Sequence, residues 1–252
     1  MLSRIWSCKS CDLLQIVRGG IRYPELGMRH NEAMDDIARF RLGVTERAQG
    51  RDGPVARELP ALADGVSRAV LVEGGSDRVA IEALAAARGR DLAIERVVVV
   101  PIGGAMNIRA FLGVLGPRGL NRELAGLCDV GEERFFRRGL QEAGLGDVLA
   151  PGDMEKLGFF VCSADLEDEL IRCLGTANVE QALESQGDLR AFRTFQNQPA
   201  QRGRDVDAQL RRFLGTIGGR KSRYARVLVE ALGSAPAPRP LERLLDVTAI
   251  ST

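Results

Sequence analysis

The chain has 252 residues, a hydrophobic content of 45% and a formal net charge of +1 at pH 7. A chain of this size can bury one substantial core with a smaller appendage, and it leaves too little room for two full domains. Its longest apolar runs fall far short of the about 20 residues that a membrane helix needs, and no signal peptide is recognisable, so we expect a cytoplasmic protein without a membrane segment.

The N-terminal quarter of the chain lacks sustained hydrophobic periodicity. Residues 18–20 and 49–54 are rich in glycine and other turn-forming residues. We therefore predict that residues 1–66 form an irregular or partly helical N-terminal extension.

From Arg68 onward, short apolar runs alternate with stretches of helical periodicity. The predicted strands are 69–72, 97–100, 124–128 and 159–162, and the predicted helices are 77–87, 106–115 and 132–143. This alternation predicts an α/β domain over residues 67–233, with a Rossmann-like parallel sheet of about four strands flanked by helices. Functional side chains of such sheets gather beyond the carboxyl ends of the strands.

A basic segment and a proline-rich segment follow the predicted strands. Residues 190–226 contain nine arginines and Lys221 against two aspartates, a net charge of +8. We expect this basic part to be helical. Residues 235–240 read Ala-Pro-Ala-Pro-Arg-Pro, so residues 234–252 are predicted to form an extended linker and a short tail.

Acidic residues follow the first predicted strand at once. Glu73 stands at the strand end, Gly74 and Gly75 permit a tight turn, and Asp77 lies at the start of the next helix. Helix capping by Ser76 and Asp77 would be a structural explanation for part of this motif. It does not account for Glu73, because a carboxylate that ends a buried strand is costly unless something positive binds it.

Two further predicted strands deliver carboxylates to the same edge. Asp129, Glu132 and Glu133 follow the third strand, and Asp165 and Glu167 follow the fourth. Clustered carboxylates repel one another, and Mg²⁺ or Mn²⁺ commonly relieves this repulsion. An ordinary acidic helix N-terminus would explain the group after the fourth strand equally well.

These motifs resemble a known domain. The run Val72-Glu73-Gly74-Gly75-Ser76-Asp77 and the later Asp129 look like the Toprim signature of topoisomerases, primases and certain nucleases. The loop 103–107, the Asp165-Leu166-Glu167 run and Lys221 narrow the resemblance to the Toprim part of OLD-family (overcoming lysogenization defect) nucleases. The resemblance covers residues 69–232. It implies that Glu73, Asp77 and Asp129 bind divalent metal ions and that Lys221 assists catalysis.

The chain departs from the pattern of this family in two ways. The usual Asp-x-Asp after the third strand reads Asp129-Val130-Gly131, so the second aspartate is missing, and Glu132 or Glu133 is a candidate replacement. Residues 215–222 do not have the spacing of a Walker A motif, so we predict no ATP site and leave any ATPase function to a separate partner. The further metal ligands would come from this acidic edge: Glu133, Asp165 and Glu167.

The basic segment is predicted to bind the backbone of nucleic acid, with DNA favoured. Lys221 is one of only three lysines against 32 arginines, which indicates that a compact ammonium is needed there. Two solvated helical faces that attract each other would give the same charge pattern. We expect a metal-dependent endonuclease, with an inactive or partner-dependent binding module as the alternative and the oligomeric state left open. The predicted backbone-binding residues are Arg211, Arg212, Arg220, Arg223 and Arg226.

Overall fold

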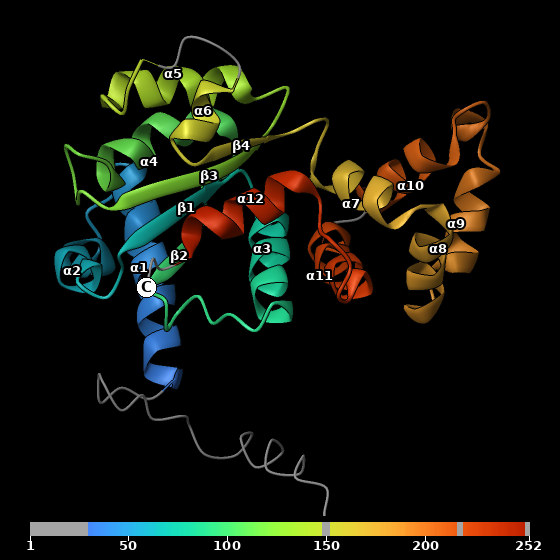
Figure 1. Cartoon of the computed structure of the whole chain (residues 1–252), viewed down its shortest axis with the longest axis horizontal. Helices are drawn as coiled ribbons and strands as arrows, with labels where there is room; N and C mark the ends of the chain where they lie inside the picture. Colours follow the sequence, from blue (N-terminus) through green and yellow to red (C-terminus); the bar gives the residue numbers. More distant parts are fainter. Residues whose placement is uncertain (1–29, 148–151, 216–218, 250–252) are drawn as a thin grey trace, which may run out of the picture.

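A four-stranded parallel sheet lies at the centre of the computed structural model, which describes residues 30–147, 152–215 and 219–249 (Figure 1). The strand order is β2-β1-β3-β4, so β1 and β3 are the inner strands. The strands are β1 (Arg68–Val72), β2 (Val97–Pro101), β3 (Glu123–Asp129) and β4 (Phe159–Cys162). Because all four strands are parallel, their carboxyl ends meet at one edge of the sheet.

Both faces of the sheet are covered, and the side chains of each strand alternate between two hydrophobic cores. Val70 and Val72 of β1 point into one core, whereas Ala69 and Leu71 point into the other. All four are at most 1% exposed. A sheet that is buried on both faces needs continuous apolar runs, which explains why its strands show no alternation of polar and apolar residues.

One face is covered by the helices that lie below the sheet and to its right in Figure 1. Of these helices, α7 to α10 form a lobe beside the sheet, and α11 lies between this lobe and α3. The helices of this group are α3 (Gly75–Ala87), α7 (Leu166–Leu174), α8 (Thr176–Ser185), α9 (Leu189–Gln196), α10 (Val206–Gly215), α11 (Arg220–Leu232) and α12 (Arg239–Thr248), with the 3₁₀ helix η3 (Pro199–Gln201).

Helices from the first 156 residues of the chain cover most of the other face, where α4, α5 and α6 lie above the sheet in Figure 1. These elements are α1 (His30–Ala48), α2 (Pro54–Ala63), the 3₁₀ helix η2 (Ala105–Asn107), α4 (Ile108–Leu115), α5 (Glu133–Ala143) and α6 (Asp153–Lys156). The prediction of a four-stranded parallel α/β sheet flanked by helices is confirmed.

The N-terminal region differs from the predicted extension. Its described part forms the helices α1 and α2, whose side chains Phe40, Val44 and Leu59 are at most 2% exposed and belong to the core of that face. This burial was missed because the apolar positions are few and separated by charged residues. Residues 1–29 lie outside the described part of the chain.

The C-terminal segment also differs from the predicted linker and tail. Residues 239–248 form α12, and its residues Leu241, Leu244 and Leu245 are at most 5% exposed in the core beneath β3 and β4. Pro240 stands in the first turn of this helix, where a proline needs no backbone N–H donor. The proline-rich stretch therefore starts a core helix instead of separating a tail from the domain.

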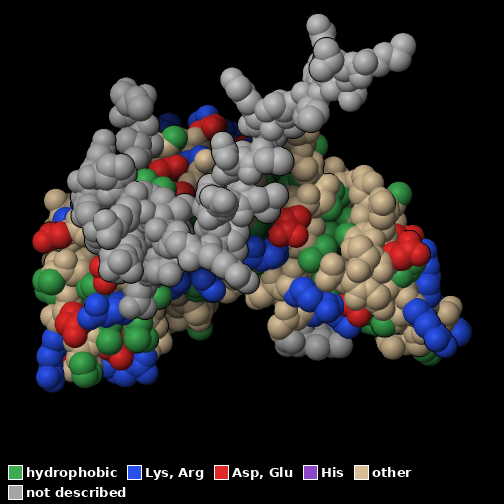
Figure 2. All heavy atoms as spheres, turned by 90° about the horizontal axis from the view of Figure 1, so that it is seen from below, with side chains coloured by type: hydrophobic (Ala, Val, Ile, Leu, Met, Phe, Trp, Pro, Cys, Tyr) green, Lys and Arg blue, Asp and Glu red, His purple; other side chains and the backbone are tan. Residues whose placement is uncertain are grey.

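The surface carries charges of both signs. Figure 2 shows the lysine and arginine side chains of one face in separate groups, interspersed with acidic ones. None of the helices in the described part of the chain is long and apolar enough to cross a membrane.

Candidate metal centre

Glu73 links the ends of the two inner strands. It follows β1 directly, and its Oε1 accepts a hydrogen bond from the backbone N–H of Asp129 at 3.1 Å. Burial raises the pKa of Glu73, and the bond from Asp129 opposes this rise only in part. The carboxylate therefore stays at the edge of the sheet and points across the end of β3.

Asp77 lies in the first turn of α3 and caps that helix. Its Oδ2 accepts a hydrogen bond from the backbone N–H of Gly74 at 2.8 Å. Burial raises the pKa of Asp77 to about 6, and the charges of Glu167 and Glu73 contribute to this rise. Asp77 therefore caps α3, as the structural explanation expected, and it also lies close to other carboxylates.

Asp129, at the end of β3, is electrostatically coupled to the other acids of the group. Burial raises its pKa to about 8, and four other carboxylates add to the rise. In decreasing order of effect they belong to Glu73, Asp77, Asp165 and Glu167. The ends of β1, β3 and β4 therefore bring their acids to one place, as the parallel topology predicts.

The segment after β4 carries two acids in different surroundings. Asp165 caps α7 by accepting a hydrogen bond from the N–H of Asp168 at 2.9 Å, and it pairs with Arg211 at 2.6 Å. Glu167 is only 3% exposed, and its Oε1 is buried with no hydrogen-bond partner among the described residues. A buried carboxylate oxygen without a partner is costly, and such an atom calls for a missing ligand.

Lys221 brings a second positive charge, besides Arg211, to this acidic group. It lies in the first turn of α11, and its Nζ is 2.9 Å from Oε2 of Glu167. Burial lowers the pKa of Lys221, but the charges of Glu167, Asp165 and Asp77 outweigh this effect and raise it. The structure therefore places Lys221 with the acids of the strand ends.

The two candidates for the missing second aspartate have different neighbours. The charge of Glu132 contributes to the raised pKa of Glu73. Glu133 begins α5 and pairs with Arg137 at 3.6 Å. Glu132 is therefore electrostatically coupled to Glu73, whereas Glu133 is paired with an arginine of its own helix.

These side chains offer carboxylate oxygens, which are the ligands that a hard divalent cation prefers. One of these oxygens, Oε1 of Glu167, has no hydrogen-bond partner among the described residues. Among the described residues, however, no three or more histidine, cysteine, aspartate or glutamate side chains are arranged to hold an ion. Most of these carboxylates also have a partner in the protein: Glu73 has the N–H of Asp129, Asp77 that of Gly74, Asp165 has Arg211, and Glu167 has Lys221.

Two of the arginines predicted to bind nucleic acid belong to an internal cluster. Asp188 accepts a hydrogen bond from the hydroxyl of Tyr224 at 2.9 Å and pairs with Arg223, and Arg220 approaches it to 3.9 Å. The guanidinium of Arg220 also stacks on the Phe213 ring at 4.1 Å, and its side chain is only 9% exposed. This cluster was missed in the sequence, because Asp188 stands in a loop without a recognisable motif.

The remaining predicted arginines lie on two helices, Arg211 and Arg212 on α10 and Arg226 on α11. Arg211 is paired with Asp165 beside β4, and Arg212 is exposed on the same helix. Arg226 borders a cavity of about 310 Å³ beside the opposite edge strand, β2, together with Arg41. The five arginines therefore do not form one continuous surface.

Comparisons with known proteins agree with this architecture. Residues 66–130 match the family model described as overcoming lysogenization defect protein-like, TOPRIM domain. The C-terminal region of the Burkholderia pseudomallei OLD protein is 26% identical with a TM-score of 0.55, over 73% of this chain and 99% of that one. The corresponding region from Xanthomonas campestris pv. campestris is 27% identical with a TM-score of 0.54, over 73% and 96%.

No curated protein matches the sequence significantly. The family model and the solved structures support a module of the Toprim nuclease family. The resemblance inferred from the sequence is thereby confirmed: the chain is a Toprim-fold protein that is similar to the C-terminal regions of OLD proteins.

Proposed function

We propose that this chain is a divalent-metal-dependent endonuclease that hydrolyses phosphodiester bonds of nucleic acid, with DNA as the favoured substrate. The observation that carries the proposal is the gathering of carboxylates around Asp129: burial raises its pKa, and four other carboxylates from the ends of β1 and β4 and the start of α3 add to the rise. Such a cluster is suited to binding positive charge, and nucleic acid hydrolysis is a common use of clustered carboxylates with a metal ion.

The proposed ligands of Mg²⁺ or Mn²⁺ are Glu73, Asp77 and Asp129. Further ligands would come from Glu132 or Glu133, Asp165 and Glu167. A bound divalent ion would supply the orientation of the scissile phosphate and a more acidic water molecule.

The protein's own residues have two tasks in this proposal. The hydrogen bond from the Asp129 N–H to Glu73 fixes the spacing of the β1 and β3 ends, so that both carboxylates face the same substrate atoms. Lys221, held by Glu167, stabilises negative charge that develops on the phosphate oxygens or the leaving oxygen. A compact ammonium suits this task because it approaches an oxygen that a planar guanidinium would crowd.

The test is cleavage of supercoiled plasmid and of single-stranded DNA by the purified full chain in Mg²⁺, Mn²⁺ or EDTA. We expect metal-dependent cutting that is lost in Glu73→Ala and Asp129→Asn. Glu184→Ala, an exposed acid on α8, is the matched control and should cut as the wild type does. Equal cutting by all variants would point to a contaminating nuclease and contradict the proposal.

A second candidate is a nucleic-acid-binding module that is inactive by itself or depends on a partner. The absence of a preformed set of three ligands among the described residues, and Gly131 in place of the second aspartate, favour it. Absence of cutting by a wild-type chain that still binds DNA would support this alternative over the nuclease.

A further inference from the structure

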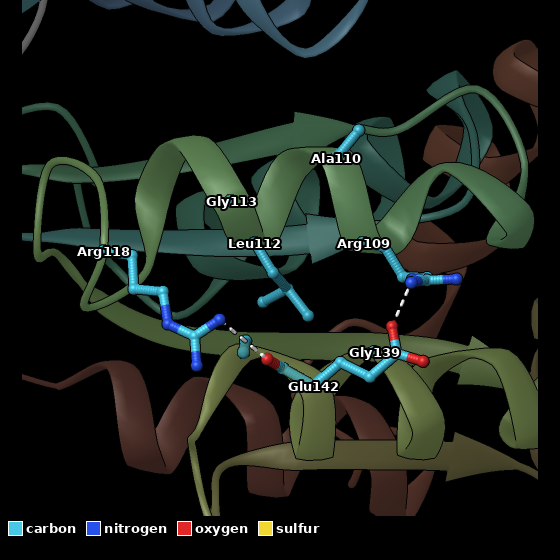
Figure 3. A pocket seen from close by; sticks show the side chains of 8 residues that line it. Arg109, Ala110, Leu112, Gly113, Arg118, Gly139 and Glu142 are labelled. Atoms are coloured by element: carbon cyan, nitrogen blue, oxygen red, sulfur yellow. Dashed lines mark hydrogen bonds and ion pairs between the residues drawn. The ribbon is translucent and has the colours of Figure 1, made fainter.

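The helices α4 and α5 enclose a groove that the sequence did not suggest. They pack closely at Gly139, where an added Cβ would lie 3.0 Å from Cγ2 of Ile108. Outside this contact lies a cavity of about 380 Å³ (Figure 3). Gly113 also lines it, and a Cβ added there would meet nothing within 4 Å, so the groove is open at this point.

Glu142 organises three arginines around this groove. Its carboxylate pairs with Nε of Arg109 and with Nε of Arg138, the latter at 2.9 Å. Its backbone oxygen accepts a hydrogen bond from Arg118 at 3.3 Å. Figure 3 shows Arg109 and Arg118 at opposite ends of the groove, with Glu142 between them. The carboxylate of Glu142 thus holds two arginines, and its backbone oxygen holds a third.

The arginines keep unused donors. Both contacts with the Glu142 carboxylate involve Nε, which leaves the terminal amino groups of Arg109 and Arg138 without a described partner. The side chains of Arg109 and Arg138 are 59% and 73% exposed. A guanidinium that is held in place by one edge and exposed at the other suits a phosphate group, which it can bind through two hydrogen bonds.

The helices that form the groove both start at the acidic edge of the sheet, and the α5 residues that line the groove lie in the C-terminal half of that helix. α4 follows the loop 103–107, in which the N–H groups of Gly103 and Gly104 donate to the backbone oxygen of Glu73. α5 begins at Glu133, shortly after Asp129. Both helices therefore start at the carboxyl ends of the strands and run away from them. A strand of nucleic acid bound at these ends can continue between the two helices.

We infer that the groove between α4 and α5, with Arg109, Arg118 and Arg138 held around Glu142, binds the phosphodiester backbone of the nucleic acid that is cut. This inference rests on the proposed function and names the surface that holds its substrate. It assigns backbone binding to α4 and α5, where the side chains of Arg109 and Arg138 are 59% and 73% exposed. Arg211 and Arg223, which were predicted to bind the backbone, are less exposed, at 44% and 47%. Contacts of this kind do not read the bases, so the binding is independent of sequence.

The experiment measures binding of a fluorescein-labelled DNA duplex to the full chain by anisotropy, in EDTA so that nothing is cut. The double variant Arg109→Gln, Arg138→Gln is expected to bind on the order of tenfold more weakly. The slope of the logarithm of its association constant against the logarithm of the salt concentration should be smaller in magnitude by about two. Arg57→Gln is the matched control, because Arg57 is an exposed arginine on α2 with one carboxylate partner, Asp52. It should bind as the wild type does.

A further variant avoids the loss of the Glu142 contacts. Gly113→Glu places a negative charge in the groove at a position with room for a side chain, and it should weaken binding. Wild-type affinity in both the double variant and Gly113→Glu would overturn the inference and leave the proposed nuclease intact. Inorganic phosphate should not displace the duplex when its concentration equals that of the phosphate groups in the duplex. Displacement under these conditions would also overturn the inference and indicate a site for small anions. Weakened binding in a chain that cuts no DNA would support the groove and contradict the nuclease.

Discussion

Lys221 and Glu167 form an ion pair with an Nζ–Oε2 distance of 2.9 Å, while the other oxygen of Glu167 is buried without a hydrogen-bond partner in the described part of the chain. The pair joins α11 to α7 at the acidic edge of the sheet. Its two members have different surroundings, because the Lys221 side chain is 48% exposed and that of Glu167 only 4%. Loss of the lysine therefore leaves a buried charge behind.

Removal of the Lys221 charge should affect both stability and activity. We expect Lys221→Met to lower the free energy of unfolding by about 1–3 kcal/mol, because Glu167 loses its partner. Nuclease activity should fall at least about a hundredfold. Urea unfolding and plasmid cleavage measure the two effects.

The second substitution Glu167→Gln separates these effects. In the Lys221→Met background it removes the unpaired charge, so part of the lost stability should return while activity stays low. Lys221→Arg keeps the charge and should keep most of the stability, but it should not restore activity. Full activity of Lys221→Arg would contradict the role assigned to the ammonium.

The stability of the metal-free chain should fall as pH rises from about 4 to about 8. The usual pKa of an aspartate is 3.8, and the folded chain raises that of Asp77 to about 6 and that of Asp129 to about 8. Between these values the folded chain holds protons that the unfolded chain has released, so each step up in pH favours unfolding. The stabilisation is complete below about pH 4 and is lost as the pH passes the raised values. Urea unfolding in EDTA across this range measures it.

Asp129→Asn should flatten this pH dependence, since its amide does not titrate. Mg²⁺ should stabilise the wild type more at pH 8 than at pH 5, because binding requires ionised carboxylates and releases their protons. An unchanged pH slope in Asp129→Asn would show that Asp129 does not have the raised pKa described.

The sheet and its acidic edge could be predicted because both depend on local pattern. Apolar runs define the strands, and a parallel arrangement of strands necessarily brings Glu73, Asp129 and Asp165 to the same edge. The prediction failed where a structure depends on chain segments that meet only after folding. Burial of Arg220 follows from its stacking on Phe213 and its approach to Asp188, and no feature of the basic segment distinguishes it from an exposed arginine.

The C-terminal helix α12 was missed for a different reason. The proline-rich stretch predicted a linker, although Leu241, Leu244 and Leu245 have helical spacing. The groove between α4 and α5 was missed because Arg109 and Arg138 are distant in sequence, and only the folded chain brings both to Glu142.

Asp188 should stabilise the domain through its contacts with α11. Its carboxylate accepts from the Tyr224 hydroxyl, which burial and this bond keep protonated by raising the pKa of the tyrosine, and it pairs with Arg223. We expect Asp188→Asn to lower the free energy of unfolding by about 1–3 kcal/mol and Tyr224→Phe by about 1 kcal/mol. Urea unfolding of both single variants and of the double variant gives the coupling between them, which should be clearly different from zero.

The control for Asp188 is Asp246→Asn. Asp246 is exposed and reaches Arg243 only at 3.9 Å, so its loss should change the free energy of unfolding by less than about 0.5 kcal/mol. Equal effects of the two substitutions would show that the Asp188 cluster contributes no more than a surface ion pair.

Gly126 in the inner strand β3 should not tolerate a side chain. A Cβ there would lie 2.5 Å from Cδ1 of Phe159 and 2.8 Å from the backbone oxygen of Leu71, so Gly126→Ala must displace either the ring or the neighbouring strand. Such overpacking costs about 1–3 kcal/mol of stability. Gly113→Ala provides the comparison, because a Cβ at Gly113 meets nothing within 4 Å and alanine favours the helical backbone by about 0.5–1 kcal/mol. Urea unfolding should therefore give opposite signs for the two substitutions, and a stabilising effect of Gly126→Ala would contradict the close approach of Phe159 to β3.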